Sequence, residues 1–189
     1  MNPPLPAMTP APELWTIGHS TLPLEEFLSV LEAHRIEAVA DVRSFPGSRR
    51  YPQYGKDALQ ASLARIGIAY RWMPALGGRR KPAADSPNTV WRNAGFRGYA
   101  DYMQTEAFAA ALDELLESTR PLRTTLMCAE SVWWRCHRAM VADALLARGV
   151  DVAHILDEGP STRHPGTAPL RIVDGRVSYA LTNSDTASR

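Results

Sequence analysis

The segment TTLMCAESVWWRCHRAMVADALLARGVDVAHILDEG, residues 124–159, decides the fold class. Its first part, residues 124–130, is an apolar run that predicts a strand. Residues 136–149 carry apolar side chains at helical spacing and end in glycine, which predicts an amphipathic helix. Residues 150–159 predict a second strand, and strand, helix and strand in this order form the repeating unit of a parallel sheet. The helix residues expected to face the core are Met140, Val141, Ala144 and Leu145.

The rest of the chain continues this alternation. Three further strands are expected, at residues 14–20, 37–43 and 68–76. Three further helices are expected, one beginning near Pro23, one at residues 55–67, and one at residues 96–119 with a break near Thr105. The first two of these helices should bury Leu24, Phe27, Leu28, Leu31, Leu59, Leu63 and Ile66.

The remaining segments are a loop, a hairpin and two tails. Residues 77–93 are rich in Gly, Pro, Arg and Asn and predict a long loop, and residues 170–180 predict a hairpin that turns at Asp174-Gly175. Because the strands alternate with helices, we expect an open three-layer α/β/α domain with a mostly parallel sheet, of the Rossmann or flavodoxin type, plus a C-terminal hairpin. We expect this single domain at residues 14–180, a disordered Pro-rich tail at residues 1–13, and a flexible tail at residues 181–189.

The composition favours a cytoplasmic protein with reduced thiols. Two cysteines in 189 residues are too few for a disulfide framework. No apolar stretch approaches the roughly 18 to 20 residues that a membrane span needs, and the N-terminus lacks the pattern of a signal peptide. We therefore expect no membrane partner. No cofactor is predicted.

The charge is unevenly distributed along the chain. The net charge is only +1, but residues 43–97 contain eleven Lys or Arg against two Asp. The same stretch contains seven aromatic residues, from Phe45 to Phe96. Basic groups combined with aromatic planes are typical of sites that bind a phosphate and a base. The alternative is that several of the aromatics pack in the core and that the arginines are solvated.

Polar residues follow several of the expected strands. Because ligands of open α/β sheets bind beyond the carboxyl ends of the strands, these residues should converge on one crevice. His19 and Glu130 could transfer protons, with Asp41 or His137 as the partner of Glu130. Asp41 could instead form a structural ion pair with Arg43 or another arginine at a strand end. The candidate catalytic residues are Glu130, His19, Asp41, Cys128 and Cys136.

Arginines and glycines supply the candidate ligand-binding residues. Arginine matches the oxygens of a phosphate, and paired glycines allow backbone amides to approach an anion. The candidates are Arg43, Ser48, Arg49, Gly77, Gly78, Arg79, His137 and Arg138.

The motif CAESVWWRCHR, residues 128–138, allows several chemistries. Cys136 is expected to begin the helix, where its pKa would be lowered and it would act as a thiolate, and the same helix start would favour an anion. Cys128, Cys136 and His137 are also candidate metal ligands. Their spacing is not a familiar zinc pattern, and adjacent residues of a helix point about 100° apart. We therefore predict no metal site.

Six motifs in this order resemble the bacterial and archaeal domain-of-unknown-function family 488. They are TIGHS, DVRSFPGSRR, ALGGRRKP, FRGYADYM, MCAE and CHR, and the resemblance covers most of residues 14–156. It implies an α/β domain but no established activity. Pro23 stands where the family would have a small hydroxyl residue. The resemblance places at motif positions His19, Asp41, Arg43, Gly77, Gly78, Cys128, Glu130, Cys136, His137 and Arg138.

Three functions follow as hypotheses. The first is binding, with or without processing, of a phosphate-bearing small molecule, a nucleotide or a nucleic acid at the carboxyl ends of the strands. The second is a cysteine-dependent enzyme or a redox-responsive protein that uses Cys128 and Cys136. The third is a non-catalytic interaction module whose basic face docks an acidic partner.

Overall fold

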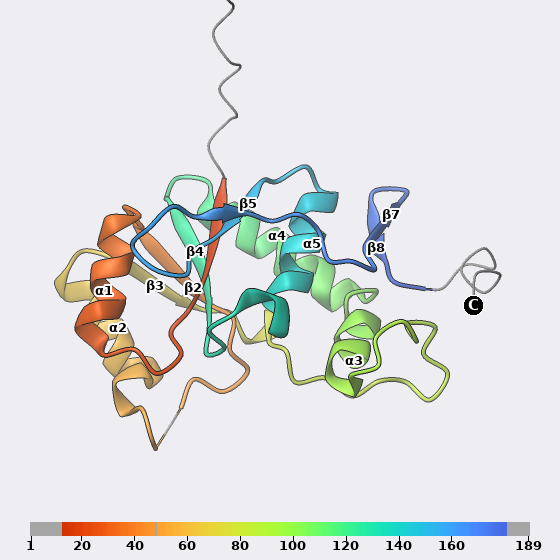
Figure 1. Cartoon of the computed structure of the whole chain (residues 1–189), viewed down its shortest axis with the longest axis horizontal. Helices are drawn as coiled ribbons and strands as arrows, with labels where there is room; N and C mark the ends of the chain where they lie inside the picture. The colour runs from red at the N-terminus through yellow and green to blue at the C-terminus, as the bar shows by residue number, and fades with distance from the viewer. Residues whose placement is uncertain (1–12, 48, 181–189) are drawn as a thin grey trace, which may run out of the picture.

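A computed structural model describes residues 13–47 and 49–180. These residues form a six-stranded sheet covered by helices on both faces, and a separate two-stranded hairpin (Figure 1). The three-layer α/β class and the C-terminal hairpin are therefore confirmed. The tails expected at residues 1–13 and 181–189 lie outside the described residues, except for Glu13, and so does Ser48.

The first half of the chain covers one face of the sheet. Its elements are β1 (Leu14–Gly18), α1 (Leu24–Ala33), β2 (Ala38–Asp41), α2 (Lys56–Arg65) and β3 (Ala69–Trp72), with a 3-10 turn at Pro52–Tyr54. Phe27, Leu31 and Leu63 are buried as expected. Ile66 is exposed, so its expected inward position is wrong. The reason is that α2 ends at Arg65, and Gly67 turns the chain with a positive φ.

The second half covers the other face. Its elements are α3 (Ala94–Tyr102), α4 (Glu106–Thr119), β4 (Thr124–Cys128), α5 (Arg138–Ala147), β5 (Val152–His154), β6 (Thr162–Arg163), β7 (Arg171–Val173) and β8 (Arg176–Ser178), with 3-10 turns at Pro74–Leu76 and Trp133–Arg135. The break expected near Thr105 is confirmed, because the Thr105 hydroxyl caps α4 by accepting a hydrogen bond from the Phe108 N–H. The turn of the hairpin is also confirmed, since Asp174 and Gly175 both have positive φ.

The strand order places a topological switch at the centre of the sheet. The order is β3-β2-β4-β1-β5-β6, with every pair parallel except β5 and β6. The connection after β2 runs toward one edge of the sheet, whereas the connection after the neighbouring β4 runs toward the other edge. Adjacent strands whose connections diverge leave a crevice at their carboxyl ends. The topology thus predicts a binding site beside the ends of β2 and β4.

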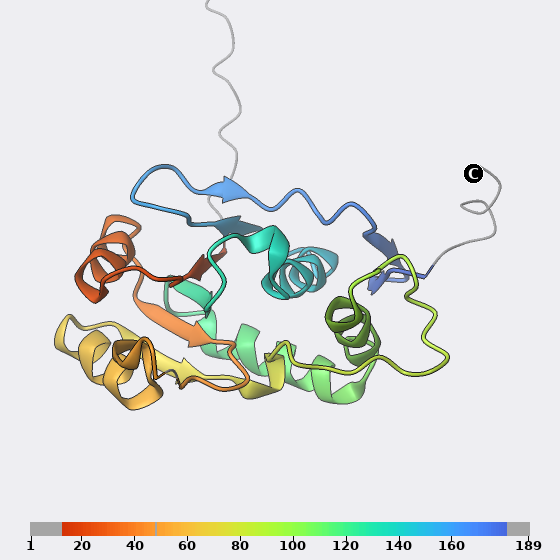
Figure 2. The same cartoon turned by 60° about the horizontal axis from the view of Figure 1, so that its bottom comes forward.

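Helix α5 differs from the expected amphipathic helix. All eight residues from Arg138 to Leu145 are buried. Figure 2 shows the cause: α5, seen almost end-on, has the sheet on one side and the other helices and the C-terminal segment around it. Asp143, on the side of α5 that would otherwise face solvent, accepts hydrogen bonds from His164, Thr167 and Tyr179 of that segment. The C-terminal segment therefore encloses α5.

The start of α5 also differs from the expectation. Cys136 does not begin the helix, because its backbone is extended (φ −127°, ψ 147°) and follows a 3-10 turn. His137 is the N-cap residue and the helix begins at Arg138. The side chains of Cys136 and His137 are therefore not held about 100° apart, as those of two adjacent helical residues would be. None of the helices in the described ranges is both long enough and apolar enough to cross a membrane.

Candidate functional site

A cavity of about 380 Å³ lies at the carboxyl ends of β2 and β4, where the strand order predicts it. Three segments that are distant in sequence form its wall: the chain after β2, the loop before α3 with the first turn of that helix, and the turn between β4 and α5. The lining residues are Arg43, Ser44, Phe45, Gly78, Arg79, Asn93, Gly95, Phe96, Cys128, Ala129, Glu130, Arg135, Cys136 and His137. The volume is within the range of about 300 to 1,000 Å³ that is usual for small-molecule sites.

Two cysteines and a histidine meet at the cavity. The Nδ1 atom of His137 lies 3.6 Å from the sulfur of Cys136 and 4.0 Å from the sulfur of Cys128. All three potential ligand atoms lie within 4.8 Å of one another. Both thiols are free and buried. The sequence argument against this arrangement assumed a helical Cys136, and that assumption is wrong.

The ring of His137 is held in one orientation. Its Nε2 donates a hydrogen bond to the backbone carbonyl of Val42 at 3.2 Å, which leaves the Nδ1 lone pair facing the two sulfurs. Gly78 packs over this ring, and a Cβ at that position would overlap Nδ1 and the neighbouring ring atoms. The glycine expected to approach an anion therefore makes room for the histidine.

The pKa values of the two cysteines are shifted in opposite directions. A hydrogen bond from Cys136 and contact with His137 lower the pKa of Cys128, against the opposing effect of burial. The hydrogen bond to Cys128, then burial, raise the pKa of Cys136. The sequence suggested that the helix start lowers the pKa of Cys136. In the structure it is Cys128 whose pKa is lowered, and the pKa of Cys136 is raised.

Asp41 and Arg43 form a buried structural ion pair. The guanidinium Nε and Nη2 donate to the two carboxylate oxygens at 2.8 and 2.6 Å, and Tyr70 donates to the same carboxylate at 2.6 Å. Asp41 is fully buried and does not line the cavity. The alternative of a structural pair, considered from the sequence, is therefore the arrangement found. Arg43 lines the cavity with its charge already compensated.

His19 is held away from the cavity by its own contacts. It stacks on Tyr54 with a centroid distance of 4.0 Å, donates from Nδ1 to the Ser20 carbonyl, and accepts from Arg43 at Nε2. Burial and the neighbouring Arg43 lower the pKa of His19 to about 4. Because the imidazole of His19 is neutral and both of its nitrogens form hydrogen bonds, its contacts are those of a structural residue.

Glu130 and Arg138 differ in their exposure and in their relation to the cavity. Glu130 is exposed and lines the cavity. Arg138 is buried outside the cavity lining, and its Nη2 donates to the backbone carbonyls of Glu130 and Ser131. Gly18 permits this packing, since a Cβ there would overlap the Glu130 carbonyl and Arg138. Arg138 therefore shapes the turn that carries Glu130.

Of the ligand-binding candidates in the loops, some line the cavity and others do not. Gly78 and Arg79 line the cavity, whereas Gly77 packs against Ser44 and Arg49 lies exposed elsewhere. Arg135 and Phe96 line the cavity but were not selected as ligand-binding residues. Arg135 belongs to the CAESVWWRCHR motif and Phe96 to the basic aromatic stretch, so both signals were present in the sequence. Only the tertiary structure shows which members of each group face inward.

The fold and the cavity together define a three-layer α/β protein with a thiol- and arginine-lined site at the switch point of its sheet. The chain belongs to the family described as domain of unknown function DUF488, whose model matches residues 23–145, more than half of the sequence. The expected family membership is thus confirmed. No curated protein and no solved structure matches the chain.

Proposed function

We propose that the protein binds a phosphate-bearing ligand, a nucleotide or a nucleotide unit of a nucleic acid, in the cavity beside β2 and β4. The observation that carries this proposal is a pair of arginines without an acidic partner. Arg79 and Arg135 line the cavity from opposite segments of the chain. Among the described residues, no carboxylate lies within ion-pair distance of either one. Two uncompensated guanidinium groups at one cavity favour an anion.

Aromatic side chains support the same class of ligand. Phe45 is 70% exposed at the cavity, and the Arg79 guanidinium lies over its ring at 5.5 Å. Phe96 forms another part of the wall. An exposed phenyl ring is costly in water unless a ligand covers it, and a nucleobase stacks on such a ring with about 1 to 3 kcal/mol per base. Phosphate would contact the arginines while the base lies on Phe45.

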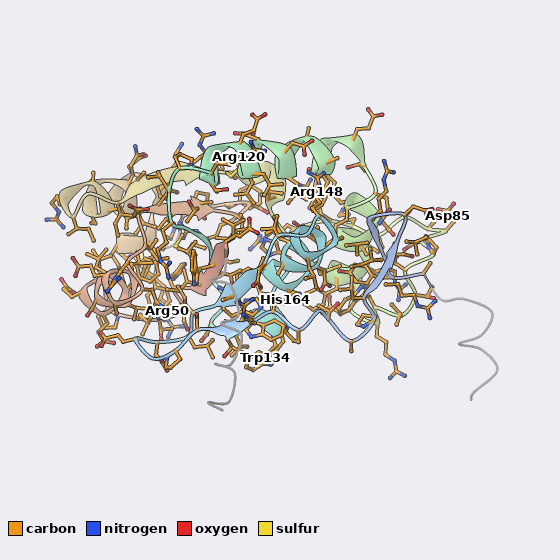
Figure 3. The ribbon with its side chains drawn as sticks, turned by 90° about the horizontal axis from the view of Figure 1, so that it is seen from above. Arg50, Asp85, Arg120, Trp134, Arg148 and His164 are labelled. Carbon is orange, nitrogen blue, oxygen red and sulfur yellow. The ribbon has the colours of Figure 1, made fainter. Side chains whose placement is uncertain are left out.

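The test compares two double variants with the same change in charge. Arg79→Gln/Arg135→Gln removes the cavity arginines, and Arg65→Gln/Arg120→Gln removes two exposed arginines at the opposite, amino-terminal edge of the strands. Arg120 is labelled in Figure 3, which views the molecule from that edge. The probes are inorganic phosphate, purine and pyrimidine nucleoside monophosphates, and a fluorescent single-stranded oligonucleotide, measured by calorimetry or fluorescence anisotropy at low salt.

We expect at least one probe to bind the wild type, and affinity to fall about tenfold or more in the cavity variant only, since each charge-assisted contact contributes about 1.5 to 3 kcal/mol. Weakening with added salt should accompany binding. Absence of binding to every probe would overturn the proposal. Equal loss in both double variants would instead indicate nonspecific attraction to the basic surface, in agreement with the alternative of an interaction module.

A further inference from the structure

We propose that Cys128, Cys136 and His137 bind one Zn²⁺ ion at the wall of the cavity, with the fourth coordination position open. The two sulfurs and one imidazole nitrogen are the ligand types that zinc prefers. The site does not depend on the proposed phosphate-bearing ligand.

The distances fit a tetrahedral ion. Zinc binds sulfur at about 2.3 Å and nitrogen at about 2.0 to 2.1 Å, which at tetrahedral angles places sulfur and nitrogen about 3.5 Å apart. His137 Nδ1 lies 3.6 Å from Cys136 Sγ and 4.0 Å from Cys128 Sγ. The two sulfurs lie within 4.8 Å of each other, whereas tetrahedral zinc places two sulfurs about 3.8 Å apart, so the thiol side chains must move closer together.

The surroundings of His137 are those of a metal ligand. A ligating histidine almost always donates its other ring N–H to a carbonyl or carboxylate, and His137 donates from Nε2 to the Val42 carbonyl. Its free lone pair is therefore on Nδ1, the atom that faces the sulfurs. Gly78 keeps the space over this nitrogen clear of a side chain.

Backbone amides support the two sulfurs. The backbone N–H of Glu130 lies near Cys128 and that of Arg138 lies near Cys136, where each favours a thiolate. Such groups orient the sulfurs of a metal site and disperse the negative charge of thiolates. The buried cation of Arg138 lies near Cys136 and adds to this effect.

The coordination count indicates a reactive rather than a closed site. Within residues 13–47 and 49–180, no fourth His, Cys, Asp or Glu joins the three ligands. Structural zinc sites have four protein ligands, whereas catalytic sites have three and admit water or substrate. Both cysteines and His137 line the cavity, as does Glu130. A zinc-bound water would thus share the cavity with a carboxylate able to accept its proton.

The test measures metal directly. Protein without a histidine tag is purified under reducing conditions without chelator, and its metal content is determined by mass spectrometry. Metal-free protein is then titrated with Co²⁺, which reports thiolate ligands by sulfur-to-metal charge-transfer absorption and tetrahedral geometry by intense visible bands. We expect about one metal ion per chain and both absorption features.

Variants assign the ligands. Cys128→Ser, Cys136→Ser and His137→Gln should each weaken Co²⁺ binding by about 100-fold or more and change its spectrum, because a three-ligand site has no spare donor. His34→Gln is the matched histidine control, since His34 contacts the Asp157 carbonyl and is not part of the cavity wall. If a variant fails to fold by circular dichroism, X-ray absorption on the wild type decides, with two sulfurs and one nitrogen as the expected protein ligands.

Three results would overturn the proposal. They are a folded, reduced wild type that takes up no metal, metal uptake that survives replacement of any of the three ligands, and a Cys128–Cys136 disulfide in protein purified anaerobically. The disulfide would favour the redox alternative. Failure of the phosphate proposal is distinguishable, because Arg79→Gln/Arg135→Gln should retain the Co²⁺ spectrum even where it loses the anionic probe.

Discussion

At the scale of single residues, buried charge and steric contact separate the structural members of the motifs from the functional ones. Asp41, Arg43 and His19 stand at strand ends, where a sheet of this class places its ligands, yet they bind one another. Arg79, Arg135 and Glu130 lie at the same edge, and among the described residues none of them forms an ion pair. Sequence position predicts the edge on which a residue lies, and its contacts decide what it can do there.

The Asp41–Arg43 pair should contribute strongly to stability. Asp41→Asn leaves the buried guanidinium without a carboxylate, which costs about 3 to 5 kcal/mol in the free energy of unfolding. Glu114→Gln, in the exposed pair of Arg71 and Glu114, is the control and should cost less than about 1 kcal/mol. Urea denaturation of both variants measures the difference. If both variants lose less than about 1 kcal/mol in the free energy of unfolding, the Asp41–Arg43 pair is not important for stability.

Gly78 should control the position of His137. Gly78→Ala places a methyl group against the ring, so His137 must shift. We expect Co²⁺ affinity to fall about 10- to 100-fold, as for other changes to groups that orient a metal ligand. Gly47→Ala is the control, because a Cβ at Gly47 meets no atom within 4 Å. Unchanged cobalt spectra in Gly78→Ala would contradict this role.

At the scale of elements, the chain after β5 fastens the sheet to α5 through a buried hydrogen-bonded series. Thr16 donates to His154, His154 donates to His164, and His164 donates to Asp143 of α5. The directions follow from Asp143, which can only accept when ionised. His164, labelled in Figure 3, is buried, and the ring of Trp133 packs edge-on against it with a centroid distance of 5.5 Å. One set of polar contacts thus joins β1, β5, the residue after β6, and α5.

This series predicts a pH dependence of stability. Burial, then the neighbouring His164 and Arg138, lower the pKa of His154 from 6.5 to about 3. Between these values the unfolded chain binds more protons than the folded one, so the free energy of unfolding decreases as the pH falls, by up to about 1.4 kcal/mol per pH unit. His154→Gln should reduce this slope. Denaturation curves at several pH values between about 6 and 4 measure it, and an unchanged slope would contradict the assignment.

At the scale of the whole molecule, the part matched by the family model is smaller than the folding unit. The match covers residues 23–145, whereas β1 pairs with both β4 and β5 near the middle of the sheet. The segment after β5 supplies the partners of the buried Asp143. The matched region by itself lacks the central strand and the segment that encloses α5.

Residues 23–145 alone should therefore fail to fold cooperatively, whereas residues 13–180 should fold. Residues 23–145 contain neither β1 nor β5, so β4 loses the ladder partner on one of its edges, and unpaired buried backbone groups are costly. Circular dichroism during thermal unfolding, and the dispersion of amide signals in NMR spectra, distinguish the two outcomes. A sharp unfolding transition of residues 23–145 would show that β1 is dispensable.

The sequence by itself determined the local structure and the class of fold. Apolar spacing, glycines after helices and the capping Thr105 are short-range signals, and they placed the main helices and strands of the sheet and its hairpin. It also placed the site residues at the carboxyl ends of the strands, since parallel strands share that edge. It did not locate β6, because two residues carry no periodic pattern, and it did not show that α5 is buried all around.

Only the tertiary structure decided which of the candidate residues meet. Cys136 and His137 are adjacent in sequence, and their use as a pair depends on where α5 begins, which is at Arg138, two residues later than expected. The carboxylate of Asp41 depends on Tyr70 from β3, and the position of His137 depends on Gly78 and Val42, which lie in distant parts of the chain. These are contacts between segments far apart in the chain, and local patterning carries no information about distances between such segments.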